Sequence, residues 1–442
     1  MVNVRIKIST QWPNKNSLYW LYEQYIGVSI WPMKLAFKTQ LFANNHEQAY
    51  LRKACGVDRF CWNWGLAAWN AQYKAHRDNP ALPKPNGKAL KKQLNAIKKG
   101  EFPWMYEVTK YAAQQPFIYL DRAFKQWMKD LTSNKPKHLK KSRPKFKKKG
   151  KCVDSFYVGG DQVKVIGTKV KVPNLGWVTM AEPIKYGGHI HGMTISRQAD
   201  KWYVSFSLDV DLCMLPSERH PGGMPPSKNQ ARCGIDLGIK TLATLSRGDI
   251  THWHTPKPLT QSLRKLKRYQ RRLAKKVKTS RGYQKLKKKI ARLHKRIADI
   301  RSNTLHQLTR YLSKHFNEVV IEELNVKAMM QNRRLARSIA DVGMYEFRRQ
   351  LTYKMEWCGG QVVVADRWFA SSKLCSQCGA KHANLKLSDR MYHCVSCGHT
   401  QDRDENASVN LERYCETSHQ ENNTGRSPEI YAVGDDGSAL LD

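Results

Sequence analysis

Acidic residues are scarce in this chain. Its 442 residues include 36 Asp and Glu against 77 Lys and Arg, which gives a formal net charge of +41 at pH 7. A charge of this size exceeds what solubility requires, and the chain would repel itself without a polyanionic partner. The composition therefore predicts a nucleic-acid-binding protein, with a ribosome-associated or nonspecifically adhesive basic protein as the alternative.

Long apolar runs are also missing. No stretch of about 18 apolar residues occurs, which excludes a membrane-spanning helix on length alone. Near the N-terminus, Glu23 and Gln24 interrupt the apolar residues, and no small-residue cleavage site follows, which argues against a signal peptide. We therefore expect no membrane partner and a cytoplasmic protein.

Cysteine is infrequent, and most of the 11 cysteines stand alone. An odd number of scattered thiols favours a reducing compartment over a disulfide framework. Four of them are arranged differently, because Cys375-x2-Cys378 is followed after fifteen residues by Cys394-x2-Cys397. Two such knuckles present four thiolates to one centre, which is the closed tetrahedral set that structural Zn²⁺ prefers. The spacing predicts a zinc ribbon, and the alternative is a set of redox cysteines.

The first half of the chain alternates between strand and helix patterns. A strand is predicted at 34–41, followed by a helical stretch that begins near Asn45. Helical spacing of apolar and aromatic residues continues to about residue 134, and we expect core packing rather than base stacking to explain the aromatic side chains. Residues 155–210 alternate between apolar and polar side chains, which predicts an antiparallel sheet or barrel. The helices would then be an insertion between strands.

A basic segment at 135–151 lies between these helices and strands. Its density of positive charge would release several counterions on binding phosphates, so we expect it to contact nucleic acid, although such a segment can also be a solvated face. The candidate phosphate-binding residues are Lys140, Lys141, Arg143, Lys145, Lys147 and Lys148.

The second half begins after a segment rich in proline and glycine at 213–230, which predicts a linker. Strands are predicted near 234–237 and 242–246, followed by a basic helical hairpin. The apolar seam of this hairpin consists of Leu286, Ile290, Leu293, Ile297 and Ile300. The polar residues 416–442 predict a disordered tail.

Two carboxylates lie at predicted buried strands. Asp236 is part of the apolar sequence Gly234-Ile-Asp-Leu-Gly, where an ionised side chain costs several kcal/mol unless a metal ion or another partner compensates it. Glu322 follows the apolar run 319–321, and the neighbouring Glu323 would point to the other face. We take Glu322 as the candidate ligand of this pair.

A third carboxylate follows the zinc ribbon. The sequence Asp402-Arg-Asp-Glu-Asn-Ala predicts the start of a helix, with Asp404 and Asn406 as candidate site residues and a helix cap as the alternative role for either Asp. Carboxylates from an early strand, a middle strand and a late helix suit two-metal phosphodiester hydrolysis, because oxygen ligands bind Mg²⁺ and Mn²⁺. No Ser–His or Cys–His arrangement argues for covalent catalysis.

In combination, these patterns resemble the TnpB family, the transposon-encoded relatives of type V CRISPR effector nucleases. The resemblance runs from Met33 to about Tyr414. The motifs that carry it are Gly56-Val-Asp-Arg-Phe-Cys-Trp-Asn-Trp, Arg143-Pro-Lys-Phe-Lys, Gly234-Ile-Asp-Leu-Gly-Ile-Lys, Ile321-Glu-Glu-Leu-Asn-Val, Leu374-Cys-Ser-Gln-Cys-Gly and Asp402-Arg-Asp-Glu-Asn-Ala.

The resemblance implies a multidomain fold of the α+β and α/β classes, in which a wedge β-barrel with an inserted helical lobe precedes a RuvC nuclease domain of RNase H type. The expected parts are a wedge β-barrel at 33–43 and 135–212, a helical recognition lobe at 44–134, a RuvC domain at 231–370 and 401–415, and a zinc-ribbon module for target nucleic acid at 371–400. Residues 1–32 have no counterpart in the family pattern and are interpreted as a mis-assigned start or a private extension.

The resemblance also implies a function, that of an RNA-guided DNA endonuclease encoded by a transposon. Its expected partners are a guide RNA derived from the transposon end and double-stranded target DNA beside a short adjacent motif. Asp236, Glu322 and Asp404 would be the catalytic residues and would hold two Mg²⁺ or Mn²⁺ ions. The alternatives are a transposase or recombinase acting on transposon ends, and an RNA-guided DNA-binding protein without cleavage.

Overall fold

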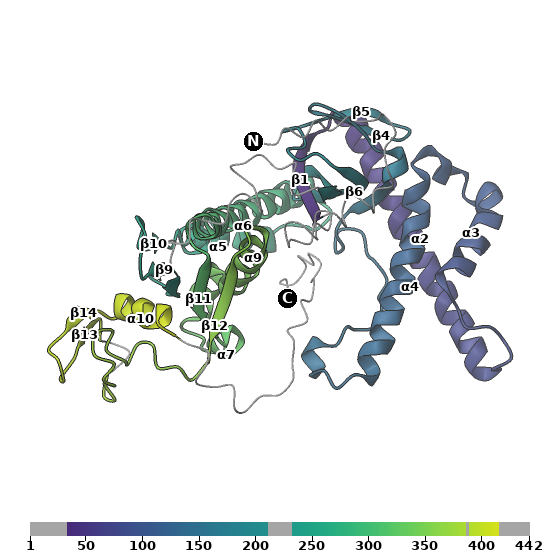
Figure 1. The fold of residues 1–442 in the computed structure, drawn as a ribbon. Helices are drawn as coiled ribbons and strands as arrows, with labels where there is room; N and C mark the ends of the chain where they lie inside the picture. Colours follow the sequence, from purple (N-terminus) through teal and green to yellow (C-terminus); the bar gives the residue numbers. More distant parts are fainter. Residues whose placement is uncertain (1–32, 211–231, 386–388, 415–442) are drawn as a thin grey trace, which may run out of the picture. The chain divides into compact units, whose positions relative to one another are not determined.

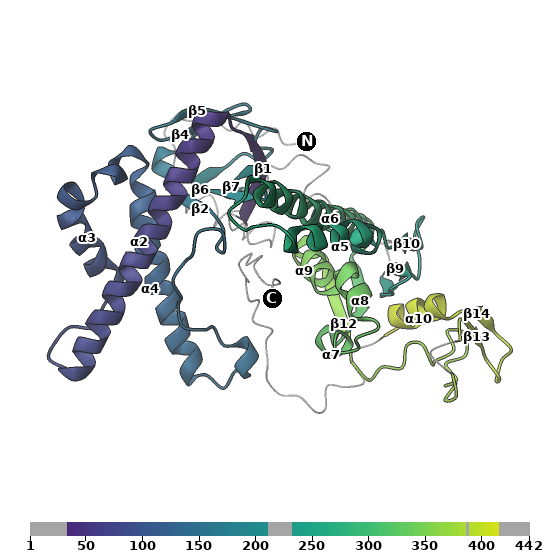
Figure 2. The ribbon, with the colours of Figure 1, turned by 180° about the vertical axis from the view of Figure 1, so that it is seen from behind.

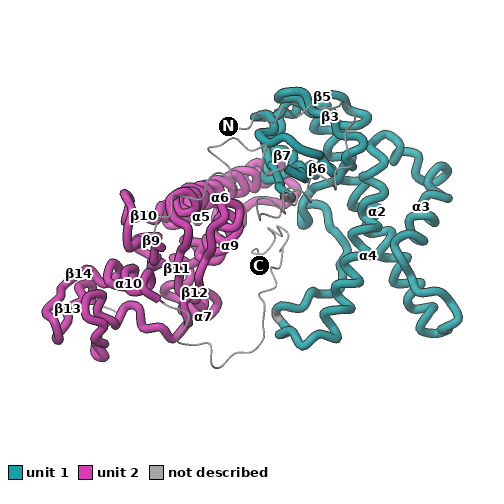
Figure 3. The backbone as a smooth tube through the Cα atoms, viewed as in Figure 1, with its two compact units in different colours: residues 1–214, 432–442 teal, residues 215–431 magenta. Residues whose placement is uncertain are grey.

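The computed structural model describes residues 33–210, 232–385 and 389–414. The chain divides into two compact units, coloured separately in Figure 3: unit 1 comprises residues 1–214 with 432–442, and unit 2 comprises 215–431. The predicted N-terminal extension, linker and C-terminal tail lie outside the described residues. Within the described residues, no helix is both long and apolar enough to cross a membrane.

Unit 1 contains one antiparallel sheet of seven strands in the order β2-β6-β7-β1-β5-β4-β3 (Figure 1). The strands are β1 Met33–Phe42, β2 Ser155–Gly159, β3 Lys164–Ile166, β4 Lys169–Val172, β5 Gly176–Met180, β6 His189–Gln198 and β7 Lys201–Val210. The strand order leaves β2 and β3 as edges, so the sheet formed by the described residues is open. The antiparallel sheet is confirmed, but a closed wedge barrel is not, because no hydrogen-bonded ladder joins the two edge strands there.

The central pairing of this sheet joins distant parts of the sequence. Strand β1 pairs with β7 from Met33 opposite Val210 to Leu41 opposite Trp202. Alternate residues of β1 are buried, which gives it one core face, as the period of two in a strand requires. The chain between β1 and β2 forms the helices, so the predicted helical insertion between strands is confirmed.

The helical part of unit 1 contains three α-helices and short 3₁₀ turns (Figures 1 and 2). Its elements are α2 Asn45–Asp78, α3 Gly87–Glu101, η1 Pro103–Glu107, α4 Lys110–Thr132 and η2 Lys137–Leu139, and a further turn, η3 Gly160–Gln162, follows β2. Helix α2 begins with a capping box, since the Asn44 side chain accepts from the Glu47 backbone at 2.9 Å and Glu47 accepts from the Asn44 backbone at 2.7 Å. Leu51 and Val57 of α2 and Phe117 of α4 are fully buried, so core packing explains much of the predicted aromatic and apolar stripe.

The segment at 135–151 is held against these helices rather than folded by itself. Asn63 of α2 exchanges two hydrogen bonds with the Lys147 backbone, at 2.8 and 3.0 Å. The buried Asp130 carboxylate of α4 accepts from the Lys141 backbone at 2.8 Å. No strand occurs between α4 and β2, so this segment adds no strand to the sheet of unit 1.

Unit 2 is built on a mixed sheet of five strands in the order β10-β9-β8-β11-β12. Its elements are β8 Cys233–Asp236, β9 Thr241–Leu245, β10 His252–His254, α5 Pro258–Ala274, α6 Arg281–His315, β11 Glu318–Glu322, α7 Val326–Met329, α8 Ala336–Val342, α9 Met344–Trp357, β12 Gln361–Ala365, β13 Met391–His393, β14 Thr400–Asp402 and α10 Arg403–Glu412. Strands β8, β11 and β12 are parallel, and β9 and β10 continue the sheet antiparallel.

Different helices pack against the two faces of this sheet. Ile235, Val319 and Ile321 belong to a core cluster that also includes buried residues of α6, α8 and α9. On the opposite face, Val320 packs in a smaller cluster with Leu411 of α10. Because alternate residues of a strand share a face, the parity of β11 places Glu322 on the side of Val320, under α10.

Helices α5 and α6 form the predicted basic hairpin. Four of the five predicted seam residues are buried (Leu286, Ile290, Leu293 and Ile297), and Ile300 is half-buried. The buried Asp341 of α8 fixes the start of this hairpin, since its carboxylate accepts from the Leu259 and Thr260 backbones at the first turn of α5 and from Arg301 of α6 at 3.1 Å.

Candidate functional site

Asp236 and Glu322 lie at the carboxyl ends of adjacent parallel strands. Strands β8 and β11 are in register, with Val319 opposite Cys233 and Ile321 opposite Ile235. The next pair in that register is Glu322 opposite Asp236. Both side chains are half-buried and share a face, whereas Glu323 lies beyond the end of β11 and is exposed. The choice of Glu322 over Glu323 therefore agrees with the geometry of the strand.

Helix α10 lies directly on this face because Gly234 leaves room for it. A Cβ at Gly234 would collide with backbone atoms of Ser408, Leu411 and Glu412. Gly234 is two residues before Asp236 on the same strand, so the helix and the Asp236 carboxylate occupy the same side of the sheet. The glycine of the Gly-Ile-Asp motif thus serves to bring the helix backbone against the strand.

Asp404 is in the first turn of α10, one turn before the contact with Gly234. The cap of the helix is Asp402, whose carboxylate accepts from the backbones of Asp404 and Glu405 at 2.8 and 3.3 Å. The capping role therefore falls to Asp402, which leaves the Asp404 side chain for other partners. It pairs with Arg403 at 3.2 Å and with Arg390 at 3.7 Å.

The pKa of Asp236 is affected by the charges of the other two carboxylates. Burial raises the pKa of Asp236 from 3.8 to about 7, with further increases from the charges of Glu322 and Asp404 and an opposing effect of Arg403. The ionised form of Asp236 is thus costly at neutral pH without a counter-charge. A divalent cation would supply that charge.

The carboxylates are more widely spread than the ligands of a single ion. Among the described His, Cys, Asp and Glu side chains, only the four zinc-ribbon cysteines have ligand atoms that all lie within 4.8 Å of one another. Two cations about 4 Å apart, each with oxygens at about 2.1 Å, are enclosed by ligands up to about 8 Å from one another. A spread beyond 4.8 Å among the three carboxylates is compatible with two such ions.

A serine that the sequence did not point to completes the surroundings of Glu322. The buried Ser371 donates from its hydroxyl to the Glu322 carboxylate. Ser371 lies in the chain between β12 and the first cysteine knuckle, 49 residues from Glu322. A serine in a polar loop carries no local pattern, so only the tertiary structure could reveal this contact.

The four cysteines form the predicted metal centre. The Sγ atoms of Cys375 and Cys397 are 3.7 Å apart, and those of Cys378 and Cys394 are 3.6 Å apart. A tetrahedron with Zn–S bonds of about 2.3 Å has edges of about 3.8 Å. The thiolates therefore fit Zn²⁺ and leave no position open for substrate, so the ion would stabilise the fold of the ribbon.

The two knuckles have the same backbone design. The Gly379 N–H donates to the Cys375 carbonyl, and the Gly398 N–H donates to the Cys394 carbonyl, each at 2.9 Å. Both glycines have positive φ, at 75° and 73°, which side chains rarely adopt. This repetition explains the glycine that follows each Cys-x-x-Cys pair.

Helix α10 also anchors the zinc ribbon. The buried Asn406 accepts from the Ser376 backbone at 2.8 Å and donates to the Leu374 carbonyl at 2.7 Å. Asn410 donates to the carbonyls of Ser371 and Leu374, at 2.8 and 2.7 Å. Asn406 was a candidate site residue, but its side chain holds the first knuckle instead. One helix therefore bears Asp404 and fastens the zinc module.

The predicted phosphate-binding residues differ in their availability. The Lys147 ammonium forms an ion pair with the buried Asp58 at 3.2 Å and lies 4.6 Å from the Trp62 ring centroid. Its charge is therefore already paired within unit 1. Lys140 is half-buried and donates to the Leu131 carbonyl at 3.3 Å. The exposed members of the set are Lys141, Arg143, Lys145 and Lys148.

Comparison with curated sequences places the chain in a family. It is 30% identical over 391 residues to "Putative RNA-guided DNA endonuclease InsQ" of Escherichia coli (strain K12), covering 85% of this chain and 91% of that protein. The chain belongs to the TnpB family. A second relative, "Putative RNA-guided DNA endonuclease" of Streptomyces pristinaespiralis, is 31% identical over 382 residues. The match covers 86% of this chain and 89% of the relative.

More distant similarity extends to a CRISPR effector. The Cas12f1 endodeoxyribonuclease of Sulfoacidibacillus thermotolerans is 23% identical over 233 residues, covering 48% of this chain and 50% of that protein. A solved Cas12f1–sgRNA–target DNA complex covers 86% of this chain and 99% of its own at 14% identity, with a TM-score of 0.31, which is too low to support a structural argument.

Three family models match parts of the sequence. They are described as "Probable transposase" for residues 212–333, "Cas12f1-like, TNB domain" for 345–411 and "Helix-turn-helix domain" for 33–78. The last description does not fit the observed fold, since residues 33–42 are strand β1 and 45–78 form the single helix α2. The second spans the four cysteines and most of α10.

Proposed function

We propose that this chain is an RNA-guided DNA endonuclease whose hydrolytic centre consists of Asp236, Glu322 and Asp404. The observation that carries the proposal is the convergence of two adjacent parallel strand ends and helix α10 on one face of the unit 2 sheet. The names of the relatives that span most of the chain supply the class of reaction and its RNA guidance. The fold of unit 2 would correspond to a RuvC domain that bears the zinc-ribbon module.

Divalent ions, Mg²⁺ or Mn²⁺, would polarise the scissile phosphate and lower the pKa of the attacking water. The protein side chains have separable tasks in this arrangement. Asp236 offers a carboxylate whose ionisation a cation would favour. The Ser371 hydroxyl orients Glu322, Arg403 pairs with Asp404, and the two carboxylates would be available to hold a divalent ion.

The partners in this proposal are a guide RNA from the transposon end and duplex target DNA with a short adjacent motif. Base pairing would read the target sequence, while the protein would hold the heteroduplex by its backbone charge. The net charge of +41 and the exposed lysines and arginine of the basic segment support such binding. We assign residues 44–134 to a recognition lobe and 371–400 to a target-nucleic-acid-binding module on the same basis.

A matched pair of variants tests the proposal. Glu322→Gln removes a ligand charge, and Glu323→Gln removes the adjacent exposed charge. With the guide RNA that copurifies with the chain, a matching duplex and Mg²⁺, we expect Glu322→Gln to lower cleavage more than about 100-fold, since even loss of a ligand's supporting partner costs 10–100-fold. Guided DNA binding should persist in both variants.

The outcome of that comparison discriminates between the functions. Equal cleavage by both variants would remove Glu322 from the centre. Absence of cleavage in the unmodified protein, with guided binding intact, would favour the RNA-guided binding protein. A strand-transfer product from transposon-end DNA without RNA would favour a transposase, the activity in the description that matches residues 212–333.

A further inference from the structure

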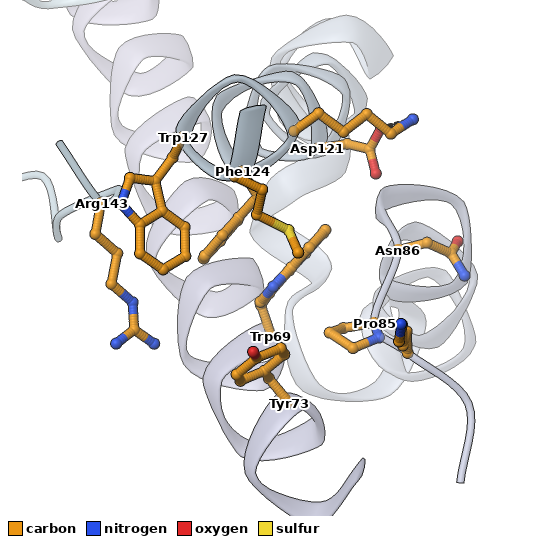
Figure 4. A pocket seen from close by; sticks show the side chains of 11 residues that line it. Trp69, Tyr73, Pro85, Asn86, Asp121, Phe124, Trp127 and Arg143 are labelled. Atoms are coloured by element: carbon orange, nitrogen blue, oxygen red, sulfur yellow. Dashed lines mark ion pairs between the residues drawn. The ribbon is translucent and has the colours of Figure 1, made fainter. Parts of the chain in front are cut away.

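A cavity of about 220 Å³ opens among the helices of unit 1 (Figure 4). Residues of α2, the loop before α3, α4 and the basic segment line it. Its volume is below the roughly 300–1,000 Å³ of pockets that enclose drug-sized ligands, and above the roughly 150 Å³ of a cavity that binds benzene. The cavity therefore has room for one flat ring system rather than for a whole cofactor.

The wall of this cavity is aromatic. Trp69 and Phe124 stack at 4.3 Å between centroids with a 2° angle between their planes, and both are buried. Trp127 meets Phe124 edge-on at 6.1 Å, and Tyr73 borders the same space with 43% of its surface exposed. The stacked pair is helix core, but Tyr73 and the half-buried Trp127 keep surface open to the cavity.

Cationic side chains surround the aromatic wall. The Arg143 guanidinium lies 5.6 Å from the Trp127 ring centroid and is steadied by a 2.9 Å hydrogen bond to Asn70. The exposed Lys84 lines the cavity as well. Lys125 is balanced by Asp121 at 2.8 Å, so Arg143 and Lys84 provide the net positive charge. An apolar ring site with adjacent cations is complementary to a base and its neighbouring phosphates.

We propose that this aromatic pocket, formed by Trp69, Tyr73, Phe124 and Trp127, holds one unpaired base of the guide RNA, with Arg143 and Lys84 contacting the flanking phosphates. The inference rests on the proposed RNA-guided function and adds a specific contact in the helical lobe. Aromatic faces accept any base, so the pocket selects for an unstacked nucleotide more than for its identity.

RNA suits the pocket better than target DNA for an energetic reason. A base taken from duplex DNA must first be unpaired and unstacked, which costs a few kcal/mol. A loop or single-stranded end of a guide RNA offers such a base without that cost. The basic segment that carries Arg143 is pinned to α2 and α4 by backbone hydrogen bonds, so the pocket is formed before RNA arrives.

The experiment measures binding of the full chain to a short oligouridine RNA and to a duplex DNA of the same length over a range of salt concentrations. Trp127→Ala should weaken RNA binding by between about 5- and 150-fold, the loss expected for one base stack, and leave the salt dependence unchanged. Arg143→Ala should reduce the slope of log K against log salt by about 0.7, because one phosphate contact is lost. Trp127→Phe should recover most of the affinity.

The control is Tyr119→Ala, which removes a partly exposed aromatic side chain of α4 outside the pocket and should leave RNA affinity unchanged. Equal affinities of the Trp127→Ala and Tyr119→Ala proteins would overturn the proposal and leave Trp127 as packing. An equal loss for the RNA and the duplex DNA would also overturn the proposal, because the pocket is proposed to hold an unpaired base. Neither result would bear on cleavage by the carboxylate centre, which the Glu322 and Glu323 variants test separately.

Discussion

Asp236→Asn is expected to stabilise the metal-free protein around β8 while abolishing its cleavage of DNA. The pKa of Asp236 is raised from 3.8 to about 7 in the folded chain, mainly by burial. The folded state therefore holds this proton more tightly than the unfolded state does. Stability of the metal-free protein is lost as pH rises from about 4 to about 7, and the loss is complete above that range.

The magnitude follows from the size of the shift. Each pKa unit corresponds to about 1.4 kcal/mol, so a shift of about 3 units gives up to about 4 kcal/mol at pH 8. The isosteric amide introduced by Asp236→Asn does not ionise and escapes this cost. The difference in stability between variant and unmodified protein should thus grow with pH and become level above about pH 7.

Hydrogen exchange of the β8 and β11 amides provides the assay, because it reports local opening in a chain of two units that need not unfold in one step. Comparing both proteins at the same pH cancels the intrinsic exchange rate. Saturating Mg²⁺ should narrow this difference by stabilising only the unmodified protein, by about 2.7 kcal/mol at 100 times the dissociation constant. A difference that stays constant between about pH 5 and 8, or equal effects of Mg²⁺ on both proteins, would refute the reasoning.

Three further substitutions test the structural elements around the carboxylate centre. Gly234→Ala should cost about 1–3 kcal/mol or more, measured by thermal unfolding, because its Cβ meets the α10 backbone, and native-like stability would contradict the described packing. Asp341→Ala should destabilise the α5–α6 hairpin by about 1–3 kcal/mol, seen as faster exchange of α5 amides, since it removes the carboxylate that accepts from the start of α5 and from Arg301. Cys375→Ser should abolish stoichiometric zinc content and increase proteolysis within 371–400, whereas Cys358→Ser, at a cysteine outside the cluster, should change neither.

The parts of the centre that local patterns describe were predictable from sequence. A short apolar run that ends in a carboxylate predicts a buried strand with an acidic end, and both β8 and β11 have that form. The repeated Cys-x-x-Cys spacing predicts one tetrahedral site, which the four Sγ atoms bear out. Local patterns could not predict that β8 and β11 are neighbours in parallel register, because strand pairing depends on long-range contacts.

The remainder depended on contacts between distant residues. The position of the basic segment is fixed by Asn63 and Asp130, whose partners are 84 and 11 residues away in sequence. Serine, asparagine and aspartate in loops and helices have many possible partners, so their individual contacts are not encoded in local periodicity. The same limit explains why Asn406 resembled a site residue, although it anchors the ribbon.

The most direct measurement is the anomalous scattering of Mn²⁺ in crystals of the protein with guide RNA and target DNA. The account predicts two ions about 3.5–4 Å apart, with carboxylate oxygens of Asp236, Glu322 and Asp404 at about 2.0–2.3 Å from one or the other. Manganese bound elsewhere, with Glu322 still paired to Ser371 and Asp404 to Arg403 beside a bound scissile phosphate, would contradict it.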